Sequence, residues 1–334
     1  MSLRDIAIAL TTINPPTRTV ELFADSPQVG KIYVAGDSKT PDSSWKLPNL
    51  AKIQYLPITQ HEDLSSALAR SVPEAHYSRK LFAYLAATRD GAEAIIDTDD
   101  DNFLDGTLGD VELDDKWLVS AEHLGWCNIH GHFGAADTHP RGLPLEEILG
   151  ARTKKLCLHK SKVRVGVLQW LVNGDPDLDA IHRLTREDFP VFEQKAPIAL
   201  GLGSVSPFNS QNTLFRRECF PLLYLPTTVS FRYTDILRSV VAQPIMWSQG
   251  FLLGVASANS TQVRNVHNHF EDFLSEIPMY TTVNKAFDIA NSVTKTGSMQ
   301  NDLYETYAAL AKERIVGDGE LSSLEAWLSA LEKP

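Results

Sequence analysis

Four carboxylates gather within five residues, at Asp97, Asp99, Asp100 and Asp101, directly after the apolar run 94–96. Like charges this close repel one another, which lowers stability unless a cation neutralises them. Mg²⁺ and Mn²⁺ bind one or two protein carboxylates and complete their coordination with phosphate oxygens. The cluster therefore predicts a divalent-metal site that faces a diphosphate. A solvated acidic turn is the alternative.

Two basic segments could serve the same chemistry. Arg79 and Lys80 precede the apolar face of an expected helix, where they could neutralise a diphosphate; a solvated helix face explains them equally well. A second basic run, between residues 152 and 164, indicates either a surface loop or contact with an anionic substrate.

His267 and His269 alternate along the chain, so on an extended segment both face one side and could contact one metal ion. A structural role is the alternative. Neutral amides of the kind that recognise sugar hydroxyls lie in the polar run 207–213, which a turn also explains: Asn209, Gln211 and Asn212.

Asp235 is a single carboxylate between Arg232 and Arg238 in an apolar neighbourhood. The two arginines should keep it ionised. It is a candidate catalytic base or sugar-orienting group, and a buried ion pair is the alternative.

Short apolar runs alternate with polar helical stretches over the first hundred residues. The expected strands are 6–10, 31–35, 52–57 and 94–96, with a helix at 76–90 that stops at Gly91. Such an order predicts a mostly parallel sheet with helices on both faces, and ligands bound beyond the carboxyl ends of its strands. Residues 271–332 are expected to be helical, with Ser322 or Ser323 as N-cap of a final helix.

The chain has 334 residues, 31 Lys+Arg against 42 Asp+Glu, and a formal net charge of −11. This balance argues against a general binder of nucleic acid. Its 3 cysteines are far apart, which excludes a disulfide framework and favours a reducing compartment. No apolar stretch approaches the ~18 residues of a membrane span. We expect a cytoplasmic protein without a transmembrane segment, and leave peripheral membrane contact open.

Several motifs occur in an order that resembles the STELLO-type glycosyltransferase-like family, over about residues 5–270. They are Thr11-Thr12-Ile13, Gly36-Asp37-Ser38-Lys39-Thr40-Pro41, Tyr77-Ser78-Arg79-Lys80, Asp97 to Asn102, Pro140-Arg141-Gly142-Leu143-Pro144, Asn209 to Thr213 and Gln262 to His267. The resemblance implies an α/β GT-A fold, with a Rossmann-like nucleotide half at 1–105, an acceptor half at 106–270 and a helical extension at 271–334.

The resemblance also implies roles on the nucleotide side. Thr11, Thr12 and Asp37 would hold the base and ribose, Arg79 would meet the diphosphate, and Asp100 would contribute to donor binding. The polar amides of the run 207–213 would read the donor sugar.

For the metal, the resemblance implies an Asp-x-Asp motif that holds Mn²⁺ or Mg²⁺. Asp101 would bind the ion, Asp99 would contact the ribose or the ion, and His267 would be a distal ligand, with His269 left open in its place. Asp235 matches a position where GT-A enzymes often carry a carboxylate that faces the acceptor or donor sugar.

Taken together, these residues predict a metal-dependent glycosyltransferase of glycan or polysaccharide synthesis. Its donor would be a nucleoside-diphosphate sugar, with UDP as the expected nucleotide, and its acceptor a hydroxyl group. One alternative is a sugar-nucleotide mutase, related to the reversibly glycosylated polypeptides, but Ile148 stands where that pattern has a glycosylated arginine. A non-catalytic sugar-nucleotide scaffold is another. The sugar, the acceptor, the stereochemistry and a homo-oligomeric state stay open.

Overall fold

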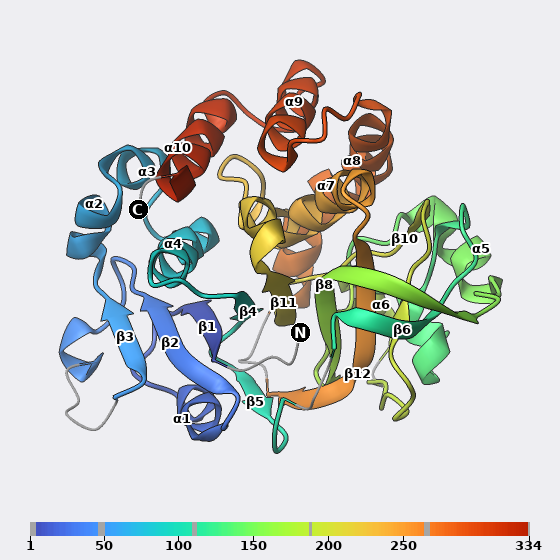
Figure 1. Ribbon diagram of the computed structural model, residues 1–334, viewed down its shortest axis with the longest axis horizontal. Coiled ribbons are helices and arrows are strands. Elements are labelled where there is room, and N and C mark those ends of the chain that lie inside the picture. The colour runs from blue at the N-terminus through green and yellow to red at the C-terminus, as the bar shows by residue number, and fades with distance from the viewer. Residues whose placement is uncertain (1–4, 46–50, 109–111, 187–188, 264–267, 333–334) are drawn as a thin grey trace.

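The computed structural model describes residues 5–45, 51–108, 112–186, 189–263 and 268–332. A ten-stranded sheet runs through the molecule in the order β3-β2-β1-β4-β11-β8-β6-β9-β12-β5, and β8 also pairs with β12 (Figure 1). Its strands are β1 Ile6–Thr11, β2 Val29–Ala35, β3 Ile53–Leu56, β4 Ala94–Thr98, β5 Asn102–Leu104, β6 Asp114–Val119, β8 His159–Gly174, β9 Ile198–Ala199, β11 Asn212–Arg216 and β12 Leu252–Gln262. β7 Gly125–Trp126 and β10 Ser204–Val205 form a small second sheet.

The first four strands pair in parallel, as their continuous apolar runs predict. Alternate side chains of β1 enter two different cores: Ile8 and Leu10 on one face, Ala7 and Ala9 on the other. Beyond β4 the sheet is mixed, because β11 runs antiparallel to β4 and β8 whereas β12 runs parallel to β8.

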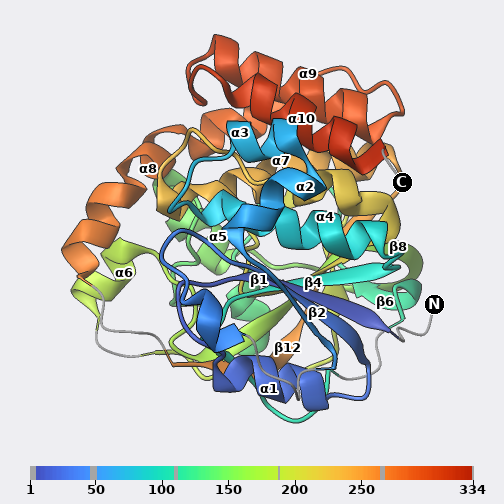
Figure 2. The same cartoon turned by 90° about the vertical axis from the view of Figure 1, so that its left-hand side faces the viewer.

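Helices cover both faces, so the predicted α/β class is confirmed. α1 Arg18–Asp25 lies on one face of the parallel strands, and α4 Leu81–Arg89 lies on the other (Figure 2). α2 His61–Leu64 and α10 Glu320–Glu332 pack against α4, and α3 Ser66–Ser71 packs against both α2 and α10.

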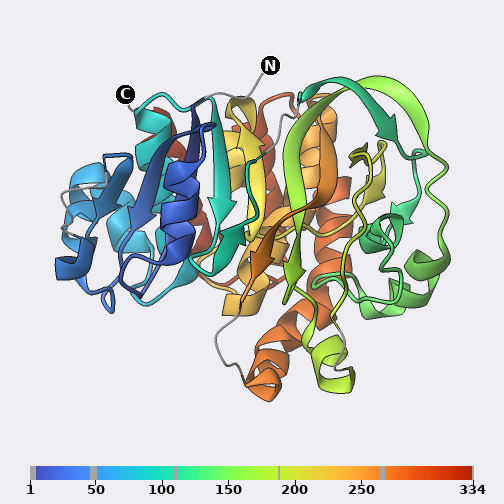
Figure 3. The same cartoon turned by 90° about the horizontal axis from the view of Figure 1, so that it is seen from below.

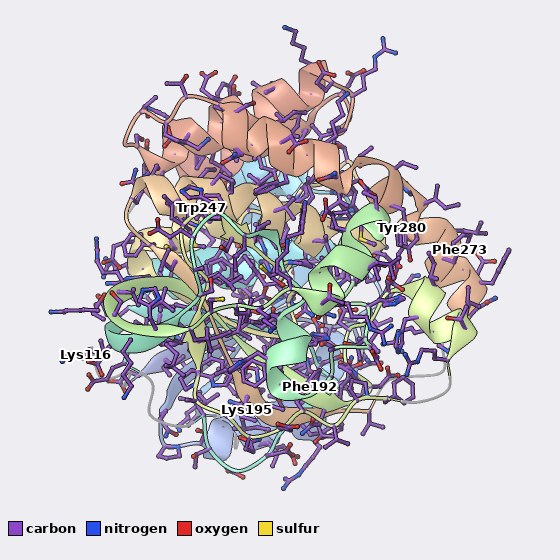
Figure 4. All side chains as sticks on the ribbon, turned by 90° about the vertical axis from the view of Figure 1, so that its right-hand side faces the viewer. Lys116, Phe192, Lys195, Trp247, Phe273 and Tyr280 are labelled. Atoms are coloured by element: carbon purple, nitrogen blue, oxygen red, sulfur yellow. The ribbon has the colours of Figure 1, made fainter. Side chains whose placement is uncertain are left out.

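The remaining helices belong to the second half of the chain. They are α5 Ile148–Thr153, α6 Ala180–Thr185, α7 Thr234–Ser248, α8 His269–Ser292 and α9 Met299–Lys312. In Figure 3 the first turns of α8, in orange, extend beyond the sheet together with α6, in yellow-green. Figure 4 shows Phe273 and Tyr280 along this part of α8, where their ring centroids are 6.1 Å apart.

The boundaries of two predicted helices differ in the structure. The helix expected at 76–90 is a 3₁₀ turn, η3 Tyr77–Lys80, followed by α4, and Gly91 ends it with φ 84°. The final helix begins at Glu320, before the predicted N-cap, because helical backbone starts directly after Gly319, whose φ of 91° lies in the left-handed region. The Glu320 carboxylate accepts hydrogen bonds from the backbone of the loop at 227–228. No helix among the described residues is long and apolar enough to cross a membrane.

Candidate functional site

A cavity of about 400 Å³ lies beyond the carboxyl ends of β1, β2 and β4, where an open α/β sheet binds its ligands. Both halves of the chain contribute to its wall. The lining residues are Thr11, Thr12, Ile13, Asn14, Asp37, Lys39, Ala75, His76, Tyr77, Asp99, Asp100, Asp101, Arg141, Asp177, Gln211, Phe231, Arg232, Asp235 and Gln262.

The acidic turn is partly neutralised by the protein itself. The fully buried ammonium of Lys80 lies 2.8 Å from Asp97 Oδ1 and 2.9 Å from Asp99 Oδ1, and Arg238 donates to Asp97 Oδ2 at 2.7 Å. Burial alone would raise the pKa of Asp97, but Lys80 and Arg238 hold it below its usual value. Two buried cations of the protein thus offset part of the repulsion in this cluster, at Asp97 and Asp99.

Asp99 occupies the boundary between this buried network and the cavity. Burial raises its pKa, against the opposing effect of Lys80 and of the Tyr77 hydroxyl, which donates to Asp99 Oδ1 at 2.7 Å. Its side chain is 27% exposed, so it faces both the buried cation and the cavity.

Asp100 joins the acidic turn to the loop after β1. The hydroxyl of Thr12 and the amide of Asn14 both donate to Asp100 Oδ2, and the Thr17 hydroxyl donates to its backbone carbonyl at 2.7 Å. These bonds fix two neighbouring strand ends relative to each other.

Asp37 anchors the other side of the cavity. Its two carboxylate oxygens accept hydrogen bonds from the backbone N–H groups of Ala75 and His76, at 2.9 and 3.0 Å. Thr11 lies nearby at the cavity wall, with its hydroxyl donating to the Ala35 carbonyl at 2.8 Å.

The donor atoms at the acidic turn fit a hard divalent cation. Asp99 and Asp101 both line the cavity, and Asp101 Oδ2 accepts a hydrogen bond from Gln262 at 3.0 Å. Within the described ranges, no three His, Cys, Asp or Glu side chains form a metal-binding group. Two carboxylates with further oxygens from a diphosphate are nevertheless a usual Mg²⁺ arrangement. His267 lies outside the described residues.

A fully paired arginine forms the opposite wall. Arg141 donates from Nε to Asp177 at 2.8–2.9 Å and from Nη1 and Nη2 to the two oxygens of Asp235 at 2.8 Å each. Its remaining N–H groups reach the Arg232 carbonyl and Asp177 Oδ2. Burial opposes the charge, but the two carboxylates raise the pKa of Arg141 well above its usual value.

Asp235 is buried in an ion pair, although not with the arginines expected from the sequence. Its partner is Arg141, because Arg238 binds Asp97 and Arg232 binds Glu276. Four donors surround its carboxylate: two from Arg141, the Ser210 N–H at 3.1 Å and the Ile236 N–H at 3.0 Å.

Three of the predicted binding residues do not line the cavity. Arg79 is directed away, with Nε donating to the Pro73 carbonyl at 3.0 Å and Nη1 lying 3.3 Å from His61 Nδ1. Asn209 and Asn212 are absent from the lining and are hydrogen-bonded within the protein.

The remaining candidates divide between the cavity and the surface. Gln211 lines the cavity as expected, whereas His269 begins α8 away from the lining. The basic run forms ion pairs at the surface, among them Arg152 with Asp137.

Sequence reasoning missed Lys80 as the buried partner and overlooked Arg141 and Asp177. Lys80 follows Arg79 in the same 3₁₀ turn, but its side chain enters the acidic turn whereas that of Arg79 points toward Pro73. Arg141 lies in the Pro140–Pro144 turn and Asp177 in an acidic turn, so each residue belongs to a motif that the sequence shows. The sequence does not show that these two residues, 36 positions apart, pair with each other.

The amino-acid sequence of the chain is similar to those of two plant proteins. The chain is 28% identical over 324 residues to probable glycosyltransferase STELLO1 of Arabidopsis thaliana, which covers 90% of the chain. It is 30% identical over 244 residues to probable glycosyltransferase STELLO2 of the same plant, which covers 67% of the chain. The predicted STELLO-type resemblance is confirmed. The chain spans 41% and 31% of the lengths of these two STELLO proteins.

Other comparisons add little to the STELLO-type relationship. No family model matches the chain. Among solved structures, glucosyl-3-phosphoglycerate synthase from Mycobacterium tuberculosis is similar at 13% identity and a TM-score of 0.43, over 88% of this chain and 82% of that chain. A complex of that enzyme with Mn²⁺, uridine diphosphate and glucosyl-3-phosphoglycerate gives 13% identity and a TM-score of 0.41, with the same coverage.

Proposed function

We propose that this chain is a metal-dependent glycosyltransferase of GT-A type, which moves a sugar from a UDP-sugar to a hydroxyl acceptor in glycan or polysaccharide synthesis. The resemblance to proteins named as probable glycosyltransferases supports sugar transfer. The observation that carries the proposal is the convergence of Asp37, Asp99 and Asp101 on one cavity beyond the parallel strands. Such a constellation suits a nucleotide with its ribose on one side and its diphosphate on the other.

In this proposal the two sides of the cavity bind different parts of the donor. Thr11, Thr12 and Asp37 would contact the base and ribose, and Lys39 would add a positive charge near the phosphates. Arg79 is withdrawn from this role, because its guanidinium is turned toward Pro73. Asp100 would act through Thr12, by fixing the loop against which the nucleotide lies.

Asp99 and Asp101 would hold Mn²⁺ or Mg²⁺ together with the donor diphosphate. When bound, the ion stabilises the negative charge that develops on the departing nucleoside diphosphate. Lys80 keeps Asp99 oriented from behind and supplies part of the charge that offsets the crowded carboxylates. Because Lys80 is fully buried and bound to Asp97 and Asp99, it would hold the acidic turn in its binding conformation before the metal ion arrives.

The acceptor hydroxyl attacks the anomeric carbon as the bond to the diphosphate breaks. In an inverting reaction Asp235 would take the hydroxyl proton; in a retaining one the diphosphate would take it and Asp235 would orient the sugar. Four donors already engage the Asp235 carboxylate, so accepting a proton requires that one of them be given up. This favours the retaining alternative.

A panel of nucleotide sugars tests the proposal. Each would be incubated with the protein and Mn²⁺, with thermal unfolding and nucleotide release as readouts. We expect one UDP-sugar to raise the unfolding temperature, because a ligand that binds only the native state stabilises it. The protein should also transfer the sugar of this donor slowly to water, which releases free UDP. Isomerisation of the sugar nucleotide would indicate a mutase instead, and binding without turnover would indicate a scaffold.

A further inference from the structure

The mouth of the cavity carries an exposed aromatic ring that the proposed chemistry has not used. Phe231 opens the 3₁₀ turn η7 Phe231–Tyr233, directly before α7. Its neighbours Arg232 and Tyr233 are buried, whereas Phe231 lines the cavity and is 58% exposed. An occupant that covered this ring would remove apolar surface from water and would gain from the contact.

The orientation of the ring is fixed from behind. Phe231 meets Tyr77 edge to face, with ring centroids 5.4 Å apart and an interplanar angle of 72°. The Tyr77 hydroxyl donates to Asp99, the carboxylate assigned above to the donor and metal. Phe231, Tyr77 and Asp99 therefore line the cavity together, with the ring beside the carboxylate that is proposed to hold the metal ion.

The wall beside Phe231 holds cations that are already paired. Arg141 uses all its N–H groups on protein acceptors, and Arg232 forms ion pairs with Glu276 at 2.7 Å and with Asp177 at 3.6 Å. A phosphate or carboxylate group on an acceptor would therefore have to compete with Asp177, Asp235 and Glu276 for these two arginines. This competition disfavours an anionic acceptor.

The same wall offers groups suited to hydroxyls. The amide groups of Gln211 and Gln262 line the cavity and contact each other, and an amide carries both donors and an acceptor for hydroxyl groups. A neutral sugar ring presents hydroxyls at its edge and an apolar C–H face. That face complements the negative face of an aromatic ring.

We propose that this region is an acceptor subsite for a neutral carbohydrate, with Phe231 as the platform on which the acceptor ring stacks. The proposal rests on the proposed function and specifies its acceptor: an uncharged glycan in preference to a phosphorylated one. Phe231 is in this view a specificity-determining residue of the acceptor side, separate from the nucleotide side.

Variants of Phe231 test the subsite. Transfer from the UDP-sugar that the nucleotide-sugar panel selects would be measured with methyl glycosides of common hexoses and pentoses, and with the 6-phosphates of the same hexoses. We expect Phe231→Ala to raise the acceptor KM on the order of tenfold, the loss of one stacking contact, with a smaller change in UDP affinity by calorimetry. Phe231→Trp should restore the KM.

Phe270→Ala is the matched control, because Phe270 is also 58% exposed but lies outside the cavity lining. It should leave the acceptor KM unchanged. Three results would overturn the subsite. They are an unchanged acceptor KM in Phe231→Ala, a preference of the wild type for the 6-phosphates, and a wild type that hydrolyses its donor but transfers sugar to no neutral glycoside. A wild-type protein that neither binds UDP nor hydrolyses any UDP-sugar would instead overturn the proposed function itself.

Discussion

Lys80 and Arg79 are adjacent in the sequence, yet they occupy different environments. The Lys80 ammonium is fully buried between Asp97 and Asp99, whereas Arg79 hydrogen-bonds to the loop at Pro73. A sequence pattern places both on the same 3₁₀ turn but does not say which one turns inward. The sequence pattern therefore identifies the turn that contributes to the site, but it does not identify which residue of the turn points into it.

Lys80→Met should affect both stability and binding. Removing one partner of a buried ion pair costs about 3–5 kcal/mol, which denaturant unfolding would report. Lys80 also opposes the rise in the pKa of Asp99, so its loss should raise that pKa further. Since the protonated carboxyl cannot hold a metal ion, Mn²⁺-dependent UDP binding should be lost at a higher pH than in the wild type. Arg79→Met, as control, should leave this pH dependence unchanged; equal shifts in both variants would contradict the assignment.

Asp235→Asn tests how the second carboxylate works. The amide keeps the shape but loses the charge that binds Arg141, so transfer should fall between about 10- and 100-fold, as for the loss of a charged hydrogen bond. If Asp235 orients the sugar, the acid side of the pH–rate profile of kcat should keep its position. Disappearance of that limb would show that Asp235 is the base after all.

At the level of elements, the C-terminal helix α10 is tied to the core by a buried carboxylate. Glu320 accepts hydrogen bonds from the backbone N–H groups of Thr227 and Thr228 and from the Tyr224 hydroxyl. Trp327, further along α10, is fully buried and donates to the Pro221 carbonyl at 3.1 Å. The local sequence pattern predicts that α10 is helical, and contacts with residues about 100 positions earlier in the chain hold this helix in place.

Glu320→Gln should lower the free energy of unfolding by about 1.5–3 kcal/mol, because the amide replaces an acceptor oxygen by a donor that faces backbone N–H groups. Chemical denaturation would measure this loss. Glu325→Gln on the exposed side of the same helix is the control and should change stability by no more than about 0.5 kcal/mol. Similar values for the two variants would argue that Glu320 does not anchor α10.

For the whole molecule, the sequence predicted the parts that depend on local order. The four parallel strands, and the polar residues at their carboxyl ends, follow from short apolar runs that end in Thr11, Asp37 and Asp97. The pairing of Arg141 with Asp235 joins positions 94 residues apart, and no local pattern encodes it. The strand ends that line one side of the cavity were therefore largely predictable, and the Arg141–Asp235 pair on the opposite wall was not.

We expect UDP to bind at the acidic turn through a divalent ion. Calorimetric titration of UDP into the wild type and into Asp101→Asn, each with Mn²⁺ and with chelator, tests it most directly. We predict that the wild type binds UDP only with Mn²⁺, and that Asp101→Asn loses this binding while unfolding at the wild-type temperature. Wild-type affinity that chelator leaves unchanged, or an Asp101→Asn variant that binds UDP as tightly as the wild type, would contradict the account.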